Sequence, residues 1–515
     1  MKLFAFVIYF AVILAIGIYF FIRQKSGGEK EYFLGGRSMG PWVTAMSAQA
    51  SDMSGWLLMG FPGSILAFGM GKVWIGIGLA LGTALNWIIV ARRLRRFSAA
   101  ANDSITLPQY LTNRFATANP VLKIVCAIIF LISFTVYVAS AFNAGTKVFI
   151  AVLPALQGKD GLAMVIFALI ILIYTFMGGY KAVCWTDFFQ GLLMLVAILA
   201  VPIVMVGVGD FDPAYKEAFA DGVTAFNSNP FTAGWQDIVS GLAWGLGYFG
   251  MPHILVRFMS IKNSKMIKKA STVAIVWVVL TLGAAIVIAY LARTYLLDSG
   301  VALSDKLLPA GMQSNIFIET VLNLFPAFIA GLLLAAIIAA SMSTADSQLL
   351  VASSSFTSDL YNPLIRKNKA SEKEAMWVGR IVVVVIALIA FAIAYSGLGD
   401  TSSWASNIMS MVENAWGLFG ASFGPVIILS LFWKRLNYAG AVAGIIAGAV
   451  ADIAWLVLFT STVTDAVIYN TGVYEILPGF VFGFIVTIIV TLATKAPSAE
   501  VCAIYDRALD KSIDD

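Results

Sequence analysis

Long apolar segments recur along the chain and restrict its fold more than any other feature of the sequence. From Leu3 onward, runs of roughly 20 apolar residues follow one another, and each can cross about 30 Å of hydrocarbon as a helix. The 515 residues are 60% hydrophobic and only 12% charged, whereas soluble proteins carry about 25% charged residues. Because a chain in lipid must satisfy its backbone hydrogen bonds internally, this pattern predicts an all-α protein that crosses a membrane many times.

Hydropathy predicts about 13 transmembrane helices. They lie near residues 3–22, 42–66, 73–92, 122–152, 160–178, 185–208, 235–256, 270–295, 314–346, 376–396, 404–432, 438–460 and 473–494. The first run is too long for the apolar core of a signal peptide and lacks a cleavage pattern of small residues, so we interpret it as the first span. The sixth span is followed by a long loop that we expect outside, with the acidic residues Asp210, Asp212, Glu217 and Asp221.

Basic residues indicate how the chain is oriented. Cytoplasmic loops carry an excess of lysine and arginine. With the N-terminus outside, the predicted inner loops hold most of the 33 lysines and arginines, including the clusters at 92–96 and 262–269. We therefore expect a multi-pass protein of the cell (plasma or inner) membrane with a cytoplasmic C-terminus. This asymmetry also accounts for the net charge of +5 without a nucleic-acid partner.

The second predicted span contains groups that are unfavourable in lipid. Residues 48–63 (AQASDMSGWLLMGFPG) carry Asp52, two serines and three glycines. A carboxylate at membrane depth costs about 2.5–3.5 kcal/mol on insertion scales. Non-helical backbone persists at this depth only where protein buries it or where it lines a watery cavity. Close helix packing would explain the glycines but not Asp52. The stretch therefore predicts a broken helix around a binding site.

A second interrupted span lies five spans further on. Residues 241–253 (GLAWGLGYFGMPH) contain four glycines and Pro252. Proline removes a backbone donor and glycine relaxes a helix, so this seventh span should bend or unwind. Two broken spans five apart predict a 5+5 inverted repeat within one transmembrane domain. Spans 2–6 (about 42–208) and 7–11 (about 235–432) would be the repeats, with spans 1, 12 and 13 peripheral. Close packing alone remains an alternative for the glycines of span 7.

The ninth span carries a group of hydroxyls near its end, in residues 339–350 (AASMSTADSQLL). Ser343, Thr344 and Ser347 share one helix face, and Ala340 lies one turn earlier. Hydroxyls together with carbonyls freed at an unwound segment suit a hard monovalent cation such as Na⁺. Hydroxyls in membrane helices also commonly bond their own backbone, which is the alternative here. Two acids, Asp346 beside them and one at the start of the sixth span, favour the cation.

Five stretches carry a resemblance to a known family. They are residues 51–60 (SDMSGWLLMG), 107–115 (LPQYLTNRF), 174–187 (YTFMGGYKAVCWTD), 244–258 (WGLGYFGMPHILVRF) and 342–350 (MSTADSQLL). In these motifs, and along nearly all of its length, the chain resembles the sodium/proline branch of the sodium:solute symporter family. This resemblance implies a LeuT-type fold. It also implies a secondary active transporter that takes up L-proline with Na⁺ as the coupling ion.

The resemblance also implies two sets of site residues. The principal sodium site would use the carbonyls of Ala50, Met53 and Ala340 and the hydroxyls of Ser343 and Thr344, with Asp52 needed for sodium-coupled binding. The substrate site would use Ser54, Trp56, Gly60, Tyr137, Trp244, Tyr248 and Pro252. Aromatic walls with a few polar groups suit a small zwitterion with an apolar ring, and its ammonium can gain cation–π attraction. Aromatic residues in spans can equally serve packing or interfacial anchoring.

Two further features have alternative interpretations. Some members of the wider family bind a second sodium ion, and the corresponding residues here are Asp187, Ser343, Asp346 and Ser347. These acids could instead pair with Lys181 or Arg257. The single histidine, His253, could take part in proton coupling, although a histidine at a helix bend is usually structural.

Other functions are less compatible with the sequence. No nucleotide-binding loop of the G-x-x-x-x-G-K-[ST] type occurs, and no nucleophile–base pair indicates an enzyme. A receptor would need a signalling domain larger than the polar tail 495–515. A channel would be recognised by ionic currents much larger than a fixed ratio of ions to solute allows. The nearest alternative is a sodium-coupled symporter of another small solute, such as another amino acid, a betaine-like osmolyte, pantothenate or a sugar.

Overall fold

The computed structural model describes residues 1–23, 29–177, 179–208, 229–298, 313–400, 403–460, 468–510 and 512–513. Within these ranges the regular structure is helical, apart from one isolated bridge between Met39 and Ile261. The all-α prediction is therefore confirmed for the described chain. The predicted outer loop after residue 208, with its four acidic residues, lies outside the described residues.

The described residues form a long succession of helices. The first ten are α1 (Lys2–Arg23), α2 (Glu29–Leu34), α3 (Pro41–Asp52), α4 (Phe61–Phe68), α5 (Val73–Leu85), α6 (Arg92–Ala100), α7 (Leu107–Arg114), α8 (Val121–Val152), α9 (Asp160–Met177) and α10 (Tyr180–Val208). The remainder are α12 (Trp235–Ala243), α13 (Pro252–Ser260), α14 (Ile267–Asp298), α15 (Ile316–Leu324), α16 (Ala327–Ser354), α17 (Glu372–Ser396), α18 (Ile408–Phe432), α19 (Tyr438–Phe459), α20 (Ile476–Ala493) and α21 (Ala499–Leu509).

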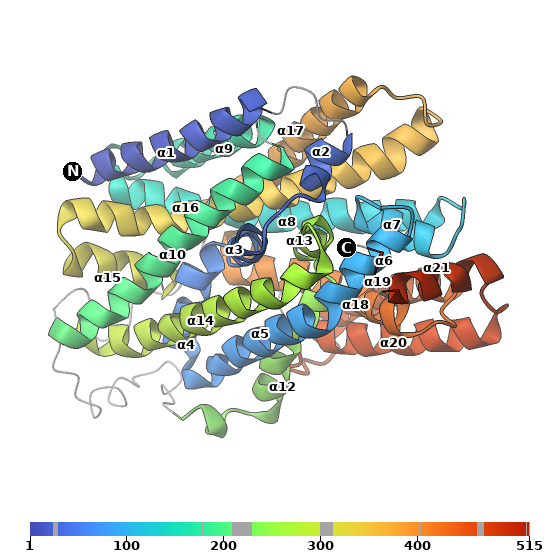
Figure 1. The fold of residues 1–515 in the computed structure, drawn as a ribbon. Helices are drawn as coiled ribbons and strands as arrows, with labels where there is room; N and C mark the ends of the chain where they lie inside the picture. Colours follow the sequence, from blue (N-terminus) through green and yellow to red (C-terminus); the bar gives the residue numbers. More distant parts are fainter. Residues whose placement is uncertain are drawn as a thin grey trace.

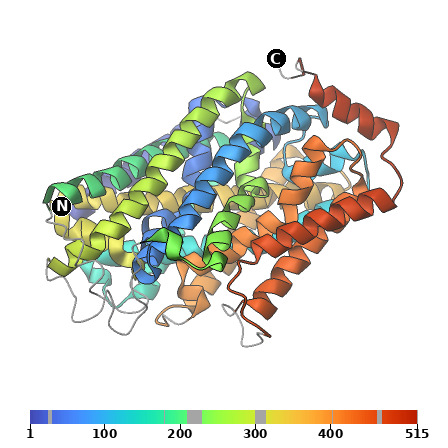
Figure 2. The same ribbon diagram turned by 90° about the horizontal axis from the view of Figure 1, so that it is seen from below.

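Ten helices of the described chain are long and apolar enough to cross a membrane. An eleventh span results if Trp235–Phe249 and Pro252–Ser260, which meet at a bend of 44°, are counted together. Two shorter apolar helices, Trp56–Phe68 and Asp160–Phe176, accompany them. The prediction of a multi-pass helical protein is confirmed. The first helix, α1, and the last helices, α19 to α21, lie on different flanks of the molecule (Figure 1, Figure 2).

Helix α16 lies at the centre of the helix packing. It contacts α1, α3, α8 and α10, and every residue from 333 to 354 is buried. Its sequence is apolar or small on all sides, which is the pattern of a helix surrounded by other helices. The hydroxyl side chains predicted in the ninth span therefore face other helices rather than lipid.

The boundaries of this ninth span differ from the prediction of residues 314–346. Helix α15 ends at Leu324, and Phe325 has extended backbone angles (φ −114°, ψ 145°). The cause is Pro326, because proline disfavours the helical conformation of the preceding residue. Helix α16 then starts at Ala327 and continues beyond residue 354 as a π-helical segment, Ser355–Ile365. The hydroxyls consequently lie in the middle of a long helix and not near its end.

Candidate functional site

The helical backbone of the second predicted span is interrupted at Met53 and Ser54. Helix α3 ends at Asp52, and Met53 has non-helical angles (φ −84°, ψ 75°). A π-helical turn, Trp56–Gly60, then leads into α4. Such turns are frequent at functional sites. We call residues 50–56 the break segment.

The carbonyl of Asp52 collects the hydrogen bonds that shape the break segment. It accepts from the Ser54 N–H at 3.0 Å, from the Trp56 indole Nε1 at 3.3 Å and from the Tyr137 hydroxyl at 3.3 Å. Tyr137 comes from α8, which is distant in sequence. A carbonyl released from the helix thus finds new donors, as buried backbone groups must.

The break segment packs tightly against α8 and α16. A Cβ atom on Gly55 would lie 2.6 Å from the Cβ of Ala144 and 3.1 Å from the Oγ of Ser341. Only glycine permits this approach, because real Cβ atoms do not come so close to a neighbour. The glycine therefore allows the break segment to lie directly against α8 and α16.

Ser343 joins the two helices at this point. Its hydroxyl lies 2.8 Å from the Ala50 carbonyl and 3.2 Å from the Ala340 carbonyl, with good hydrogen-bond geometry to both. The Thr344 hydroxyl is buried and has no hydrogen-bond partner among the described residues. Met53 is also buried, three residues after Ala50. The structure thus brings Ala50, Ala340 and Ser343 together, with a free hydroxyl beside them.

Asp52 connects the break segment to the second bent helix. Its carboxylate is fully buried, and Oδ2 accepts a hydrogen bond of 2.6 Å from the Tyr248 hydroxyl. Its other oxygen, Oδ1, has no hydrogen-bond partner in the described chain. Tyr248 is held in turn by its backbone carbonyl, which accepts from Asn86 at 2.9 Å. Asp52 therefore links the break segment to the second bent helix and leaves one carboxylate oxygen without a partner in the described chain.

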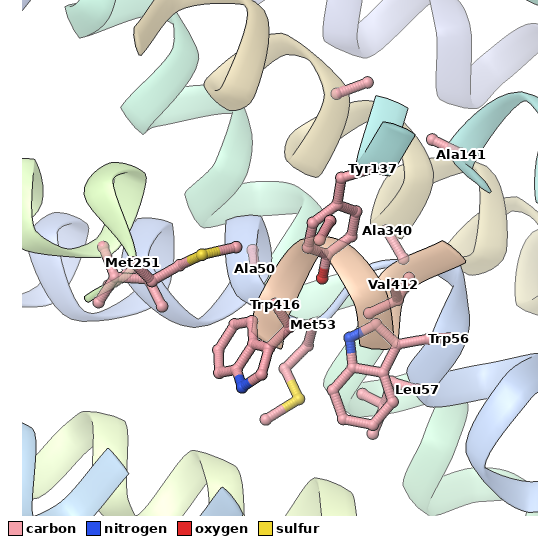
Figure 3. Close-up of a cluster of buried hydrophobic side chains, with 14 of the residues drawn as sticks. Ala50, Met53, Trp56, Leu57, Tyr137, Ala141, Met251, Ala340, Val412 and Trp416 are labelled. Atoms are coloured by element: carbon pink, nitrogen blue, oxygen red, sulfur yellow. The ribbon is translucent and has the colours of Figure 1, made fainter. Parts of the chain in front are cut away.

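Aromatic rings line the neighbourhood of the break segment. The centroids of Trp56 and Trp244 are 6.5 Å apart with an interplanar angle of 38°. Tyr248 packs edge to face against Trp416 at 5.0 Å. The hydroxyl of Tyr137 points toward the break segment, and Met53 lies between Trp56 and Trp416 in the view of Figure 3. Four of the predicted substrate residues, Trp56, Tyr137, Trp244 and Tyr248, are therefore gathered around this segment.

The other predicted substrate residues take different places. Ser54 lies in the break, where its hydroxyl accepts from the Trp56 N–H at 3.4 Å. Gly60 ends the π-helical turn, and a Cβ there would lie 3.6 Å from the sulfur of Met409 in α18. Pro252 begins α13, directly after the extended residue Met251. Pro252 therefore lies at the bend of the second interrupted helix.

Asp187 lies in a separate buried cluster, which contacts α3 through Ser47. Its Oδ2 accepts from Ser47 at 2.6 Å and from Ser347 at 3.4 Å, and it pairs with Arg257 at 3.2 Å. Arg257 also donates to the hydroxyls of Ser47 and Ser347. Of the two basic residues that the sequence offers, Arg257 is thus the partner of Asp187, because Lys181 pairs with Glu31.

Asp346 and His253 lie near this cluster and are fully buried. Neither carboxylate oxygen of Asp346 has a hydrogen-bond partner among the residues that the structure describes. The same is true of both ring nitrogens of His253, whose ring packs 5.9 Å from that of Phe134. His253 is therefore fully buried, with its ring against that of Phe134.

Three residues of these clusters were not predicted from the sequence. Trp416 of α18 donates to the Trp244 carbonyl at 2.8 Å, Asn86 holds the Tyr248 carbonyl, and Ser47 binds Asp187. Ser47 carries a usable signal, because it lies four residues before Ser51 and thus close to the polar face of the same helix. Trp416 and Asn86 carry none, since single polar or aromatic residues in apolar spans usually serve packing.

Comparisons with known proteins find a matching family profile and close relatives. The profile of the sodium:solute symporter family matches residues 32–448. The chain is 43% identical over 505 residues to sodium/proline symporter 2 of Staphylococcus saprophyticus, covering 97% of this chain and 94% of that protein. It is also 43% identical over 497 residues to a sodium/proline symporter of Staphylococcus aureus, covering 96% of this chain and 92% of that protein.

A solved structure shares the fold. It is that of a Na⁺-coupled sialic acid symporter in a substrate-bound, outward-open state, with a TM-score of 0.75 and 22% sequence identity over 96% of this chain and 98% of that one. The likeness in fold extends over nearly all of both chains. The family profile covers most of the sequence, and symporters are transporters rather than enzymes. The chain belongs to the sodium:solute symporter family.

Proposed function

We propose that this protein is a secondary active transporter that couples uptake of L-proline to entry of Na⁺ by alternating access. One observation carries the proposal: hydroxyl and carbonyl oxygens of α16 and α3 converge on the break segment, directly beside Asp52 and a group of buried aromatic rings. Relatives that are 43% identical and bear the name sodium/proline symporter support the same solute and ion.

The proposed sodium site lies between the break segment and α16. Its ligands would be the carbonyls of Ala50, Met53 and Ala340 and the hydroxyls of Ser343 and Thr344. Neutral hard oxygens suit Na⁺, which binds more weakly than a divalent ion. The free Thr344 hydroxyl supports this set, because a buried polar group without a partner is unfavourable unless a ligand satisfies it. Ser343, which now bonds two carbonyls, would turn its lone pairs to the ion.

The proposed proline site lies around the same break segment. Trp56, Tyr137, Trp244 and Tyr248 would form its walls, with Ser54, Gly60 and Pro252 at its margins. An apolar pyrrolidine ring packs well against aromatic faces, and the ammonium gains cation–π attraction there. The positive N-terminal end of the helix that resumes after the break favours the carboxylate of the solute.

The break segment provides a physical route for coupling. The carbonyl of Ala50 belongs to the ion site, whereas Trp56, six residues later, belongs to the solute site. An ion that orders the intervening backbone places the Asp52–Tyr248 pair and the Trp56 ring in position for proline. By linkage, proline then raises the affinity for Na⁺ by the same factor.

A second cation at Asp187, Asp346 and Ser347 is the weaker part of the proposal. The guanidinium of Arg257 already neutralises Asp187 and donates to the Ser347 hydroxyl. Only Asp346 keeps both carboxylate oxygens without a partner in the described chain. We therefore propose one principal sodium site and treat Asp346 as the remaining acid of a second one.

We further propose 13 spans, with spans 2–6 and 7–11 as inverted repeats. Counting the bent pair and the two shorter apolar helices as spans supports this number. The interruptions at Met53 and at Met251 occur in the second and seventh of these spans, which are corresponding positions of two five-helix units.

The proposed orientation has the N-terminus outside and the C-terminus in the cytoplasm. Predicted inner segments, distant in sequence, bond to one another in the structure. Arg95 donates to the carbonyls of Ile261 and Lys262 at 2.7 and 2.9 Å, and Arg507 donates to the Ala100 carbonyl. A single face rich in basic residues supports the assignment to the cytoplasm.

Equilibrium binding to the purified protein tests the proposal. Titration with labelled L-proline at constant ionic strength should show saturable binding with Na⁺ and little with K⁺ or choline. Unlabelled glycine betaine, pantothenate, glucose and other amino acids should compete poorly. Strong competition by one of these would assign the transporter to that solute, and binding independent of Na⁺ would contradict sodium coupling.

A further inference from the structure

Tyr474 extends the aromatic group of the proposed solute site to the last helices of the chain. It lies two residues before the start of α20 and is only 3% exposed. The centroid of its ring is 5.1 Å from that of Trp244, with an interplanar angle of 36°. Since Trp244 packs in turn near Trp56, the three rings form a row that starts at the break segment.

Hydrogen bonds hold Tyr474 against two helices of the site. Its hydroxyl donates to the Glu413 carbonyl in α18 at 2.7 Å, and its backbone N–H donates to the Ser240 hydroxyl in α12 at 3.0 Å. Ser240 donates back to the carbonyl of Gly472 at 3.3 Å. The tyrosine is therefore fixed at both ends relative to the helix that continues into Trp244.

The segment that leads to Tyr474 is itself anchored on α19. The N–H groups of Ile468 and Thr471 donate to the carbonyls at the end of that helix, Leu458 and Phe459, at 2.9 and 3.0 Å. The indole of Trp455 donates to the Val473 carbonyl at 3.1 Å. Helices α19 and α20 correspond to the last two predicted spans, so these spans support the site rather than only covering its outside.

We propose that Tyr474 is a positioning residue that sets the affinity for the solute by holding the indole of Trp244. This inference rests on the proposed function, in which Trp244 forms part of the wall around proline. Tyr474 acts through Trp244, because its ring packs on the indole and its polar atoms are bound to α18 and α12. A wall ordered before the solute arrives lowers the entropy lost on binding.

Uptake kinetics in proteoliposomes test this role. In Tyr474→Ala, the KM for proline should rise about threefold to tenfold, which is the usual effect of losing one aromatic pair. The maximal rate and the sodium concentration for half-maximal activation should stay within about twofold of wild type. Tyr474→Phe keeps the ring and should restore most of the affinity. Tyr469→Ala is the matched control, because Tyr469 lies in the same segment but is 70% exposed.

A double-mutant cycle separates positioning from a general loss of stability. If Tyr474 acts through Trp244, adding Tyr474→Ala to Trp244→Ala should leave the KM nearly unchanged. If the two substitutions instead raised the KM independently, so that their factors multiplied in the double variant, the inference would be overturned. An unchanged KM in Tyr474→Ala would also overturn it. Should the alanine variant not fold, Tyr474→Leu keeps the bulk and undergoes the same test. If the wild-type protein takes up no proline, the proposed function fails, whereas normal wild-type uptake with an unchanged KM in the variants refutes only the inference.

Discussion

Replacing Ser343 by alanine removes the hydroxyl that lies between α16 and the break segment. In the structure this hydroxyl contacts the carbonyls of Ala50 and Ala340 at 2.8 and 3.2 Å, the two carbonyls that would share the ion with it. A hydrogen-bonding group that faces a charge is worth about 1.5–3 kcal/mol. Since about 1.4 kcal/mol corresponds to a factor of ten, the sodium concentration for half-maximal uptake should rise roughly 10- to 150-fold.

The assay is the initial rate of labelled proline uptake against external Na⁺, with choline keeping the ionic strength constant. Ser353→Ala provides the matched control on the same helix. Ser353 is also buried, and its hydroxyl donates to the Leu350 carbonyl at 3.0 Å, away from the break segment. This control loses a comparable intrahelical hydrogen bond and should keep the sodium dependence of wild type.

Two results would refute this reasoning. Equal sodium dependence in Ser343→Ala and wild type would show that the hydroxyl is not an ion ligand. If Ser353→Ala raised the sodium concentration for half-maximal uptake equally, any weakening of α16 would disturb sodium activation. A thermal unfolding scan of both purified variants should show similar, small losses of stability, because each removes hydrogen bonds worth about 0.5–1.5 kcal/mol.

Individual contacts lead to three other predictions. Trp244→Ala should raise the proline KM at saturating Na⁺ at least about tenfold, because it removes a wall of the pocket; an unchanged KM would exclude Trp244 from the site. Arg257→Ala should destabilise the protein by about 3–5 kcal/mol, because it leaves Asp187 buried without its partner. Adding Asp187→Asn should recover part of that loss in a thermal unfolding assay, and the absence of recovery would contradict the pairing. Gly55→Ala should lower the free energy of unfolding by about 1–3 kcal/mol, because the added methyl group overpacks against Ala144. If that contact is the cause, adding Ala144→Gly should restore both folding and uptake.

Sequence reasoning gives its most specific predictions where a residue conflicts with its surroundings. Asp52 lies in an apolar span and breaks the pattern of a packed helix, so its role at an interruption could be predicted from local chemistry alone. Ser343 could be predicted as a cation ligand for a similar reason, because several hydroxyls share a helix face with an acid nearby. The structure places both residues at the same break, on helices that lie far apart in the sequence.

Other features depend on tertiary contacts that no local pattern reports. Trp416 reaches the Trp244 carbonyl only because α18 passes beside the bent helix. A Cβ on Gly247 would collide with the Trp416 indole, so this glycine makes the approach of the two segments possible. The division of the ninth span at Pro326 does carry a local signal. Hydropathy alone overlooks it, because the apolar run on both sides of the proline is continuous.

The most direct test of the central claim is accumulation of L-proline in proteoliposomes that contain the purified protein. An inward gradient of Na⁺, K⁺, Li⁺ or H⁺ is imposed in turn, with labelled proline at equal concentration on both sides. Sodium-coupled symport predicts that only the Na⁺ gradient drives proline to an internal concentration above the external one, and that collapsing this gradient releases it. Equilibration without accumulation, or accumulation driven equally by K⁺, would contradict sodium-coupled symport by this protein.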